Sequence, residues 1–206
     1  MKNGRKQTEN RYNENYTRYQ SDRGWLRWYL RIPYLNDVLK YVTGRTIDLG
    51  CGTGRLLSML PEGSLGLDIN PVSVDYCRNK SLNAQVYDPG KDHFALSTVQ
   101  PGEFKTLTII HVLEHLENPA DALNKLTAAC NKLLINRIVV KVPGKKGFLF
   151  DNTHKTFVDL DFIKSNKLTS LNNFKLSVSY YFPLNIKALG NYFTHNELTL
   201  IYDREN

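Results

Sequence analysis

The chain has 206 residues, of which 41% are hydrophobic and 23% are charged. This composition is ordinary for a soluble globular protein and excludes disorder over the whole length, and the length predicts one domain with at most an appendage. The net charge of +7 is unevenly spread, since residues 1–45 hold 10 basic against 4 acidic side chains and therefore carry +6 of it. That distribution argues against a nucleic-acid binder that is basic over its whole surface, and it leaves room for a local arm that attracts anions.

The cysteines and the N-terminus indicate the compartment. Cys51, Cys77 and Cys130 are widely spaced and odd in number, so neither a disulfide framework nor a zinc cluster fits them. We expect a reducing environment. The first 16 residues lack the apolar core of a secretory signal, and no apolar run reaches the length of a membrane span. Together these features predict a cytoplasmic protein.

Residues 1–43 are predicted to form a basic, aromatic, helical cap. Residues 1–22 are polar, and we expect them to be mobile or draped over the surface. A helical pattern begins near Asp22, Pro33 is expected to end or kink it, and a second helical stretch is expected over Tyr34–Tyr41. The first helix would gather four large side chains on one face: Trp25, Trp28, Tyr29 and Ile32.

Three arginines recur every four residues along this helix and would lie opposite its aromatic face: Arg23, Arg27 and Arg31. One interpretation is a solvated basic stripe, with the aromatic face packed on the rest of the protein. The other is contact with an anion, which could be a phosphate or carboxylate of a substrate, a nucleic-acid backbone or a membrane surface. The solvated stripe is favoured, and nucleic acid is the less favoured of the possible partners.

From residue 44 to residue 206 strands and helices alternate, which predicts a doubly wound, Rossmann-like α/β sheet with mostly parallel strands and helices on both faces. Seven strands are expected, at Thr46–Leu49, Leu65–Ile69, Ala84–Tyr87, Thr106–Ile110, Arg137–Val142, Lys175–Tyr181 and Glu197–Tyr202. Four helices are expected between them, near Arg55–Leu60, Asn70–Lys80, Asn118–Asn131 and Asp159–Asn166.

The clearest motif follows the first of these strands. Gly50-Cys51-Gly52-Thr53-Gly54 places glycine at alternate positions, which permits a tight turn and lets a ligand approach the backbone closely. The helix expected after it would direct amide donors at that ligand. Asp48, two residues before the first glycine, can attract a cationic group.

Two later acids lie in register with this loop. Asp68 ends the second strand, where a carboxylate can accept both hydroxyls of a ribose, and Asp88 follows the third strand, where it could meet an adenine amino group. A nicotinamide or flavin site requires G-x-G-x-x-G, whereas this loop is G-x-G-x-G. S-adenosylmethionine is cationic and has no pyrophosphate, so it fits the loop better.

The stretches Asp48–Gly54, Leu67–Pro71 and His111–Leu116 resemble the class I S-adenosylmethionine-dependent methyltransferases, in particular the quinone-biosynthesis and related small-molecule branch. The resemblance implies a seven-stranded sheet whose last strand is antiparallel. It also implies that the glycines approach the methionine part of the cofactor, Asp48 its amino group, Asp68 the ribose and Asp88 the adenine. One departure is Lys105, where the family usually has an acid. The implied cofactor-binding set is Asp48, Gly50, Cys51, Gly52, Gly54, Asp68 and Asp88.

Histidines are the candidates for acid–base or orienting work. Methyl transfer mainly requires the nucleophile to be held in line with the methyl group, and a base is needed only for an acidic acceptor. His111 ends the fourth strand at the edge where such sheets bind ligands, and His154 lies in a polar loop after the fifth. We predict these two as catalytic, against the alternatives of a structural and a surface histidine. His115 is predicted to be structural.

The spacing of His111, Glu114 and His115, followed later by His154, also permits a metal site. It resembles the E-x-x-E-H of some metal-dependent relatives, including RNA 3′-end ribose methyltransferases. Here His111 replaces the first acid, and we predict no metal.

The sequence therefore predicts an S-adenosylmethionine-dependent methyltransferase that acts on the oxygen or nitrogen of a small-molecule acceptor. The alternatives are an RNA methyltransferase that uses the basic arm, a non-catalytic cofactor-binding scaffold and, as an outside choice, a dehydrogenase.

Overall fold

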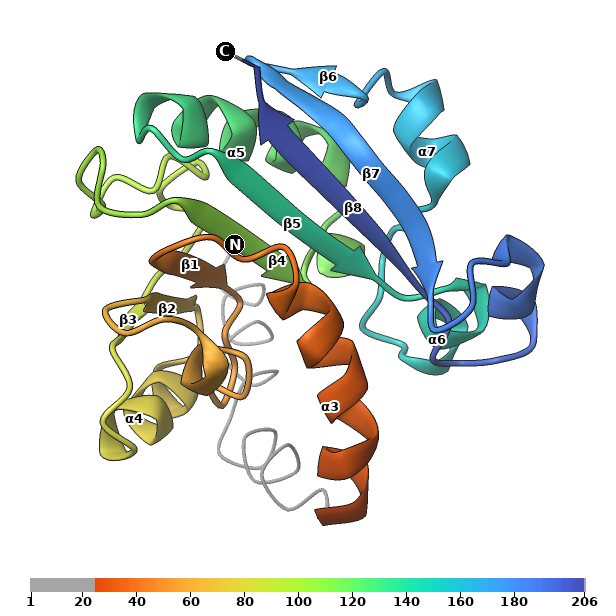
Figure 1. Ribbon diagram of the computed structural model, residues 1–206, viewed down its shortest axis with the longest axis horizontal. Helices are drawn as coiled ribbons and strands as arrows, with labels where there is room; N and C mark the ends of the chain where they lie inside the picture. Colours follow the sequence, from red (N-terminus) through yellow and green to blue (C-terminus); the bar gives the residue numbers. More distant parts are fainter. Residues whose placement is uncertain (1–24, 206) are drawn as a thin grey trace, which may run out of the picture.

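The computed structural model describes residues 25–205, with side chains described from Arg31 onward (Figure 1). Residues 1–22 and Arg23, which figured in the expected cap, lie outside this range. Eight strands form one sheet in the order β3-β2-β1-β4-β5-β8-β7-β6. Their bounds are β1 (Thr46–Leu49), β2 (Leu65–Asp68), β3 (Ala84–Val86), β4 (Thr106–Ile110), β5 (Arg137–Val142), β6 (Ser170–Leu171), β7 (Phe174–Phe182) and β8 (Glu197–Arg204).

Strands β1 to β5 pair in parallel, whereas β8 is antiparallel to both β5 and β7. This arrangement confirms the doubly wound α/β sheet and its antiparallel last strand. The expected count of seven strands was wrong by one. The additional strand, β6, is only two residues long and pairs with the start of β7, so its sequence carries too short a pattern to be recognised.

The helices are α3 (Trp25–Leu39), α4 (Pro71–Asn79), α5 (Pro119–Lys132), α6 (Lys145–Phe150) and α7 (Leu160–Ser165). Within the described residues, three short 3₁₀ helices lie in the connections: η2 (Leu57–Met59), η3 (Leu113–His115) and η4 (Lys187–Asn191). Asn70 and Asn118 cap α4 and α5 through their side-chain oxygens, and each is followed by proline at the first helical position.

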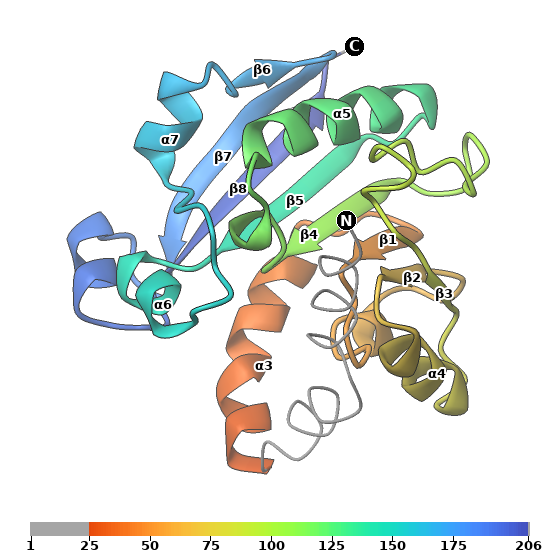
Figure 2. The same cartoon turned by 180° about the vertical axis from the view of Figure 1, so that it is seen from behind.

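The two faces of the sheet are covered by different helices, as Figure 2 shows from behind. Along β5, Ile138 and Val140 belong to the main core with α5, whereas Val139 packs with Val38 of α3. This is the alternation expected of a strand buried on both sides. Helix α3 is therefore seated on the face opposite to α5.

Helix α3 continues through Pro33, so a break at that residue is wrong and the second expected stretch belongs to the same helix. The alternative, a kink at Pro33, stays a prediction. Pro33 is exposed, so the carbonyl one turn earlier, which loses its amide donor, can turn toward water. Val38 and its neighbours on the other face pack on the sheet and hold the last turns of the helix in place.

The helix expected over Arg55–Leu60 is also absent, since only the single 3₁₀ turn η2 forms there. Leu60 adopts an extended conformation (ψ 158°) directly before Pro61. A proline disfavours helical geometry in the residue before it, and this stops the helix after one turn.

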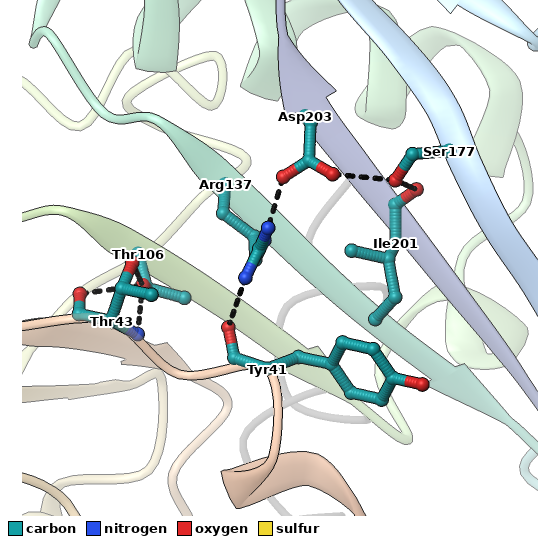
Figure 3. A network of polar contacts seen from close by, with 7 residues as sticks. All are labelled: Tyr41, Thr43, Thr106, Arg137, Ser177, Ile201 and Asp203. Atoms are coloured by element: carbon teal, nitrogen blue, oxygen red, sulfur yellow. Dashed lines mark hydrogen bonds and ion pairs between the residues drawn. The ribbon is translucent and has the colours of Figure 1, made fainter.

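A polar network fastens the segment after α3 to the sheet (Figure 3). The Arg137 guanidinium donates to the Tyr41 carbonyl at 3.3 Å and to Asp203 at 2.6 Å, and Ser177 donates to the other oxygen of Asp203. Thr43 and Thr106 bond to one another beside it. The proposed boundary between residues 43 and 44 stays a prediction.

None of the helices within residues 25–205 combines the length and the apolar character that crossing a membrane requires.

Candidate functional site

The loop after β1 is built by glycines in the left-handed conformation. Gly50, Gly52 and Gly54 have φ values of +76°, +53° and +75°. A Cβ atom on Gly50 would lie 2.5 Å from the Val112 side chain, and one on Gly54 would lie 2.8 Å from the Cys77 sulfur. The amides of Gly50 and Cys51 donate to the Leu67 carbonyl, which fixes the turn against β2. The loop therefore depends on glycine both for conformation and for space.

Asp68 lies at the end of β2 and is held by this loop. One carboxylate oxygen accepts from the Gly52 amide at 2.7 Å, and the other accepts from the Asn70 amide at 2.8 Å. Burial raises the pKa of Asp68, and the two amide hydrogen bonds act against that rise. The main chain thus fixes the orientation of the carboxylate that the sequence assigns to a ribose.

Asp48 is a buried acid near the carboxyl end of β1, which lies between β2 and β4 in the sheet. Its side chain is 3% exposed and accepts a hydrogen bond from the Thr108 hydroxyl of β4 at 2.9 Å. Burial raises the pKa of Asp48 to about 7, opposed by the Thr108 bond and aided by the nearby charge of Asp68. A cation placed beside this group would favour its ionised form.

Cys51 and Cys77 are buried free thiols beneath the loop, and both face the Gly52 carbonyl. The Cys51 side chain therefore points into the protein. Only its main chain shares in the loop surface.

Asp88 is not joined to the glycine loop. Its carboxylate accepts from the amides of Gly90 and Lys91, and it pairs with the Lys91 ammonium at 3.2 Å. Slight burial raises its pKa, but these contacts outweigh it and hold the pKa of Asp88 below its usual value. Among residues 25–205 no hydrogen bond or ion pair connects it to Asp68 or to the loop glycines. Its assignment to an adenine amino group stays a prediction.

His111, directly after β4, lies between two buried carboxylates. Its Nδ1 is 3.1 Å from Glu114 Oε1 and its Nε2 is 3.2 Å from Glu197 Oε1. Burial favours the neutral ring, but the charge of Glu197 and the bonds to both acids raise the pKa of His111 to about 9. The residue has a φ of +56°, which is uncommon outside glycine.

This protonation state bears on what His111 can do. A doubly paired imidazolium cannot accept a proton near neutral pH, so of the two roles expected for His111 the structure favours orientation over base catalysis. Its side chain keeps 23% exposure, through which it can contact a ligand.

His154 and His115 stand on the other side of Glu114. His154 donates from Nδ1 to the Phe148 carbonyl at 2.8 Å, and His115 Nδ1 contacts the Thr153 hydroxyl. The backbone carbonyl of Glu114 accepts the amides of Lys155 and Thr156, which clamps this loop onto η3. The His154 side chain is 9% exposed, so it is a packed residue and not the surface histidine that the loop sequence allowed.

Glu114, His115 and His154 offer ligand atoms within 4.8 Å of one another, so they form a group that could hold a cation. Burial and the charge of His154 lower the pKa of His115. The expectation that the protein works without a metal stays a prediction beside this geometry.

Of the arginine stripe, the structure describes the side chain of Arg31 alone. Arg31 is exposed, and its charge helps to lower the pKa of Glu197. Arg23 lies outside the described residues, as does the side chain of Arg27.

The sequence interpretation missed Glu197. It opens β8, whose remaining residues are mostly apolar. The signal was available in principle, because an antiparallel last strand starts at the edge where the parallel strands end.

A family model described as a methyltransferase domain matches residues 16–172. The ubiquinone biosynthesis O-methyltransferase of Methylococcus capsulatus is 29% identical over 111 residues, which cover 50% of this chain and 44% of that protein. The enzyme of the same name from Xanthomonas euvesicatoria is 30% identical over 125 residues, or 58% of this chain and 48% of the relative. The chain thus spans about half the length of the curated relatives it matches.

Solved structures share the fold. A methyltransferase from Archaeoglobus fulgidus, described as dependent on S-adenosylmethionine, superposes with a TM-score of 0.68 at 19% identity, covering 93% of this chain and all of that one. Magnesium protoporphyrin IX methyltransferase from Synechocystis, solved with bound S-adenosylmethionine, gives 0.62 at 14% identity over 94% of this chain and 93% of that one.

Proposed function

The chain belongs to the methyltransferase-domain family, and on that premise we propose that it transfers a methyl group from S-adenosylmethionine to an oxygen or nitrogen of a small-molecule acceptor. The observation that carries the proposal is the glycine loop with Asp68 fixed on its amides. The names of the curated relatives, which are O-methyltransferases, favour oxygen.

The chemistry of the loop fits this cofactor. S-adenosylmethionine supplies a methyl group already activated by a positively charged sulfur. Gly50 and Gly52 leave the main chain of the loop accessible to a ligand. Directly after the loop only η2 forms, and not an α-helix whose N-terminus could bind a pyrophosphate. The ionised form of Asp48 suits a nearby ammonium, and the fixed carboxylate of Asp68 suits a pair of hydroxyls. The shorter loop and the missing helix both disfavour the dehydrogenase alternative.

The protein's own part in the reaction is to bind and orient. His111 lies at the end of β4, next to the loop strand β1 in the sheet order, so it can meet an acceptor placed beside the cofactor. Because both ring nitrogens face carboxylates, we assign His111 an orienting role through the fixed position and the charge of its ring, and not through a free N–H donor. His154 contributes to the wall of this region.

The experiment is a pair of measurements on one preparation. Calorimetry with S-adenosylhomocysteine tests the cofactor site, and Asp68→Asn is the variant that should lose binding. A methyl-transfer screen with labelled S-adenosylmethionine over catechols, amines, sugars, lipid-linked phenols and RNA then tests the acceptor class. Binding without turnover on any acceptor would support the scaffold alternative, and transfer to RNA alone would support the RNA alternative.

The other expectations keep the status of predictions. An acceptor anion that contacts Arg31 is compatible with the exposure of that side chain. The cytoplasmic location rests on the sequence features described above.

A further inference from the structure

The topology of the sheet brings an additional acid to the site. Glu197 is the first residue of β8, where it pairs with Phe182 of β7, and the next residue, Leu198, pairs with Val142 at the end of β5. Because β8 runs antiparallel to β5, its first residue lies at the carboxyl ends of the parallel strands, beside His111. Glu197 lies beyond residue 172, where the match to the methyltransferase-domain model ends.

Burial of the Glu197 carboxylate costs free energy, and an ion pair can offset this cost. The residue is 4% exposed, and its Oε1 is 3.2 Å from the Nε2 of His111, which is an ion-pair contact. Among the described residues neither that Nε2 nor the Oε2 of Glu197 has a hydrogen-bond partner. A buried carboxylate is stabilising only when it is paired. Burial opposes its ionisation, but His111, Arg31 and Lys141 outweigh this effect and lower the pKa of Glu197.

The two carboxylates hold opposite edges of one ring. Glu114 contacts Nδ1 of His111 from η3, and Glu197 contacts Nε2 from β8. The main chain of His111 is fixed as well, since its amide donates to the Lys141 carbonyl at 2.9 Å. Loss of Glu114 alone or Glu197 alone would leave the ring free to turn about the remaining contact.

We propose that Glu197 is a positioning residue for the transfer reaction, which acts through His111 by fixing its ring at the acceptor side of the site. This inference rests on the proposed function. No hydrogen bond or ion pair among the described residues joins Glu197 to the glycine loop, so Glu197 sets the placement of the acceptor and not the affinity for the cofactor.

The first test is a double-mutant cycle on kcat, with labelled S-adenosylmethionine and 3,4-dihydroxybenzoate as the probe acceptor. Glu197→Gln keeps the size of the side chain and removes its charge, and it should lower kcat by about 10-fold to 100-fold, the loss typical of a misplaced reacting group. In a His111→Gln background the same change should have almost no further effect. Binding of S-adenosylhomocysteine should stay close to that of the wild type, whereas the melting temperature should fall, because Glu197→Gln removes one carboxylate from the buried ring of His111.

Asp203→Asn is the matched control, because Asp203 is an acid of the same strand that pairs with Arg137 at the opposite end. It should leave kcat unchanged. Effects of Glu197→Gln and His111→Gln that simply add would overturn the inference, as would an equal loss of cofactor binding.

A second readout does not depend on turnover. In protein with ¹⁵N-labelled histidine, the Nε2 proton of His111 should be visible by NMR as a slowly exchanging signal, assigned by its absence in His111→Gln. It should disappear in Glu197→Gln and persist in Asp203→Asn. A signal that persists in Glu197→Gln would refute the inference even if no acceptor is turned over, whereas failure to bind S-adenosylhomocysteine would refute the proposed function alone.

Discussion

Asp37 of α3 and Lys141 of β5 form a buried ion pair, with Nζ 2.8 Å from Oδ2 and both side chains at most 2% exposed. The Tyr180 hydroxyl donates to the same oxygen from β7, so three elements meet at Asp37. The Lys141 ammonium also lies 4.8 Å from the centre of the Phe182 ring. This contact holds the cap helix on the sheet through charge as well as through apolar packing.

We predict that Asp37→Ala destabilises the fold strongly. It leaves the Lys141 ammonium buried without its acid, a change that typically costs about 3–5 kcal/mol. Urea unfolding followed by circular dichroism measures the free energy of unfolding. Lys40→Ala removes the exposed partner of the same acid and should cost less than about 1 kcal/mol. Equal costs for the two variants would contradict this account of α3.

The stability of the fold should depend on pH through His111. Its pKa is about 9 in the folded chain and about 6.5 when unfolded. Since the folded value is the higher one, the contribution is fully present below about pH 6.5 and is lost as the pH rises through about 9, amounting to at most about 3 kcal/mol. The free-energy difference between wild type and His111→Gln should therefore shrink from pH 6 to pH 10. A difference independent of pH would contradict the paired, protonated ring.

We predict that the Asp48 carboxylate lowers the free energy of unfolding near neutral pH and strengthens cofactor binding. Its pKa is about 7 in the folded chain and about 3.9 when unfolded. Since the folded value is the higher one, the stabilising contribution of the neutral acid is fully present below about pH 3.9 and is lost as the pH rises through about 7, by at most about 4 kcal/mol. Asp48→Asn, whose amide oxygen can still accept from Thr108, should be more stable than wild type at pH 8 and nearly equal at pH 4, yet bind S-adenosylmethionine more weakly. Chemical denaturation at both pH values and calorimetry test the two halves.

Gly50 should tolerate no side chain. Gly50→Ala forces an L-residue into a left-handed conformation, which costs about 1–2 kcal/mol, and it also drives the new methyl group against Val112. Gly102→Ala is the matched control, because Gly102 has a φ of +85° and open space around its missing Cβ. We expect Gly50→Ala to be the less stable variant and to lose cofactor binding, whereas Gly102→Ala pays the conformational cost alone. Similar behaviour of the two would contradict the packed loop.

Local patterns predicted most of the sheet. The parallel strands have apolar, β-branched runs, and Asn-Pro pairs mark the starts of α4 and α5, so both could be located without long-range information. The glycine loop and Asp68 were predictable for the same reason, because strand, turn and acid follow one another directly.

Features that depend on distant residues were predicted wrongly or missed. Packing on the sheet lets α3 continue through Pro33, and Pro61 stops η2 after one turn. The local sequence therefore predicted neither the continuous α3 nor the short η2. Glu197 acquires its role only when β8 is placed against β5, a strand that is distant in the chain. The protonation of His111 depends on that same contact.

The central claim is tested most directly by calorimetric titration of S-adenosylhomocysteine into the wild-type chain and into Asp68→Asn and Asp88→Asn at neutral pH. We expect saturable binding at one site, abolished by Asp68→Asn, because the amides of Gly52 and Asn70 hold that carboxylate at the loop. No binding by the wild type, or binding that Asp68→Asn leaves unchanged, would contradict it.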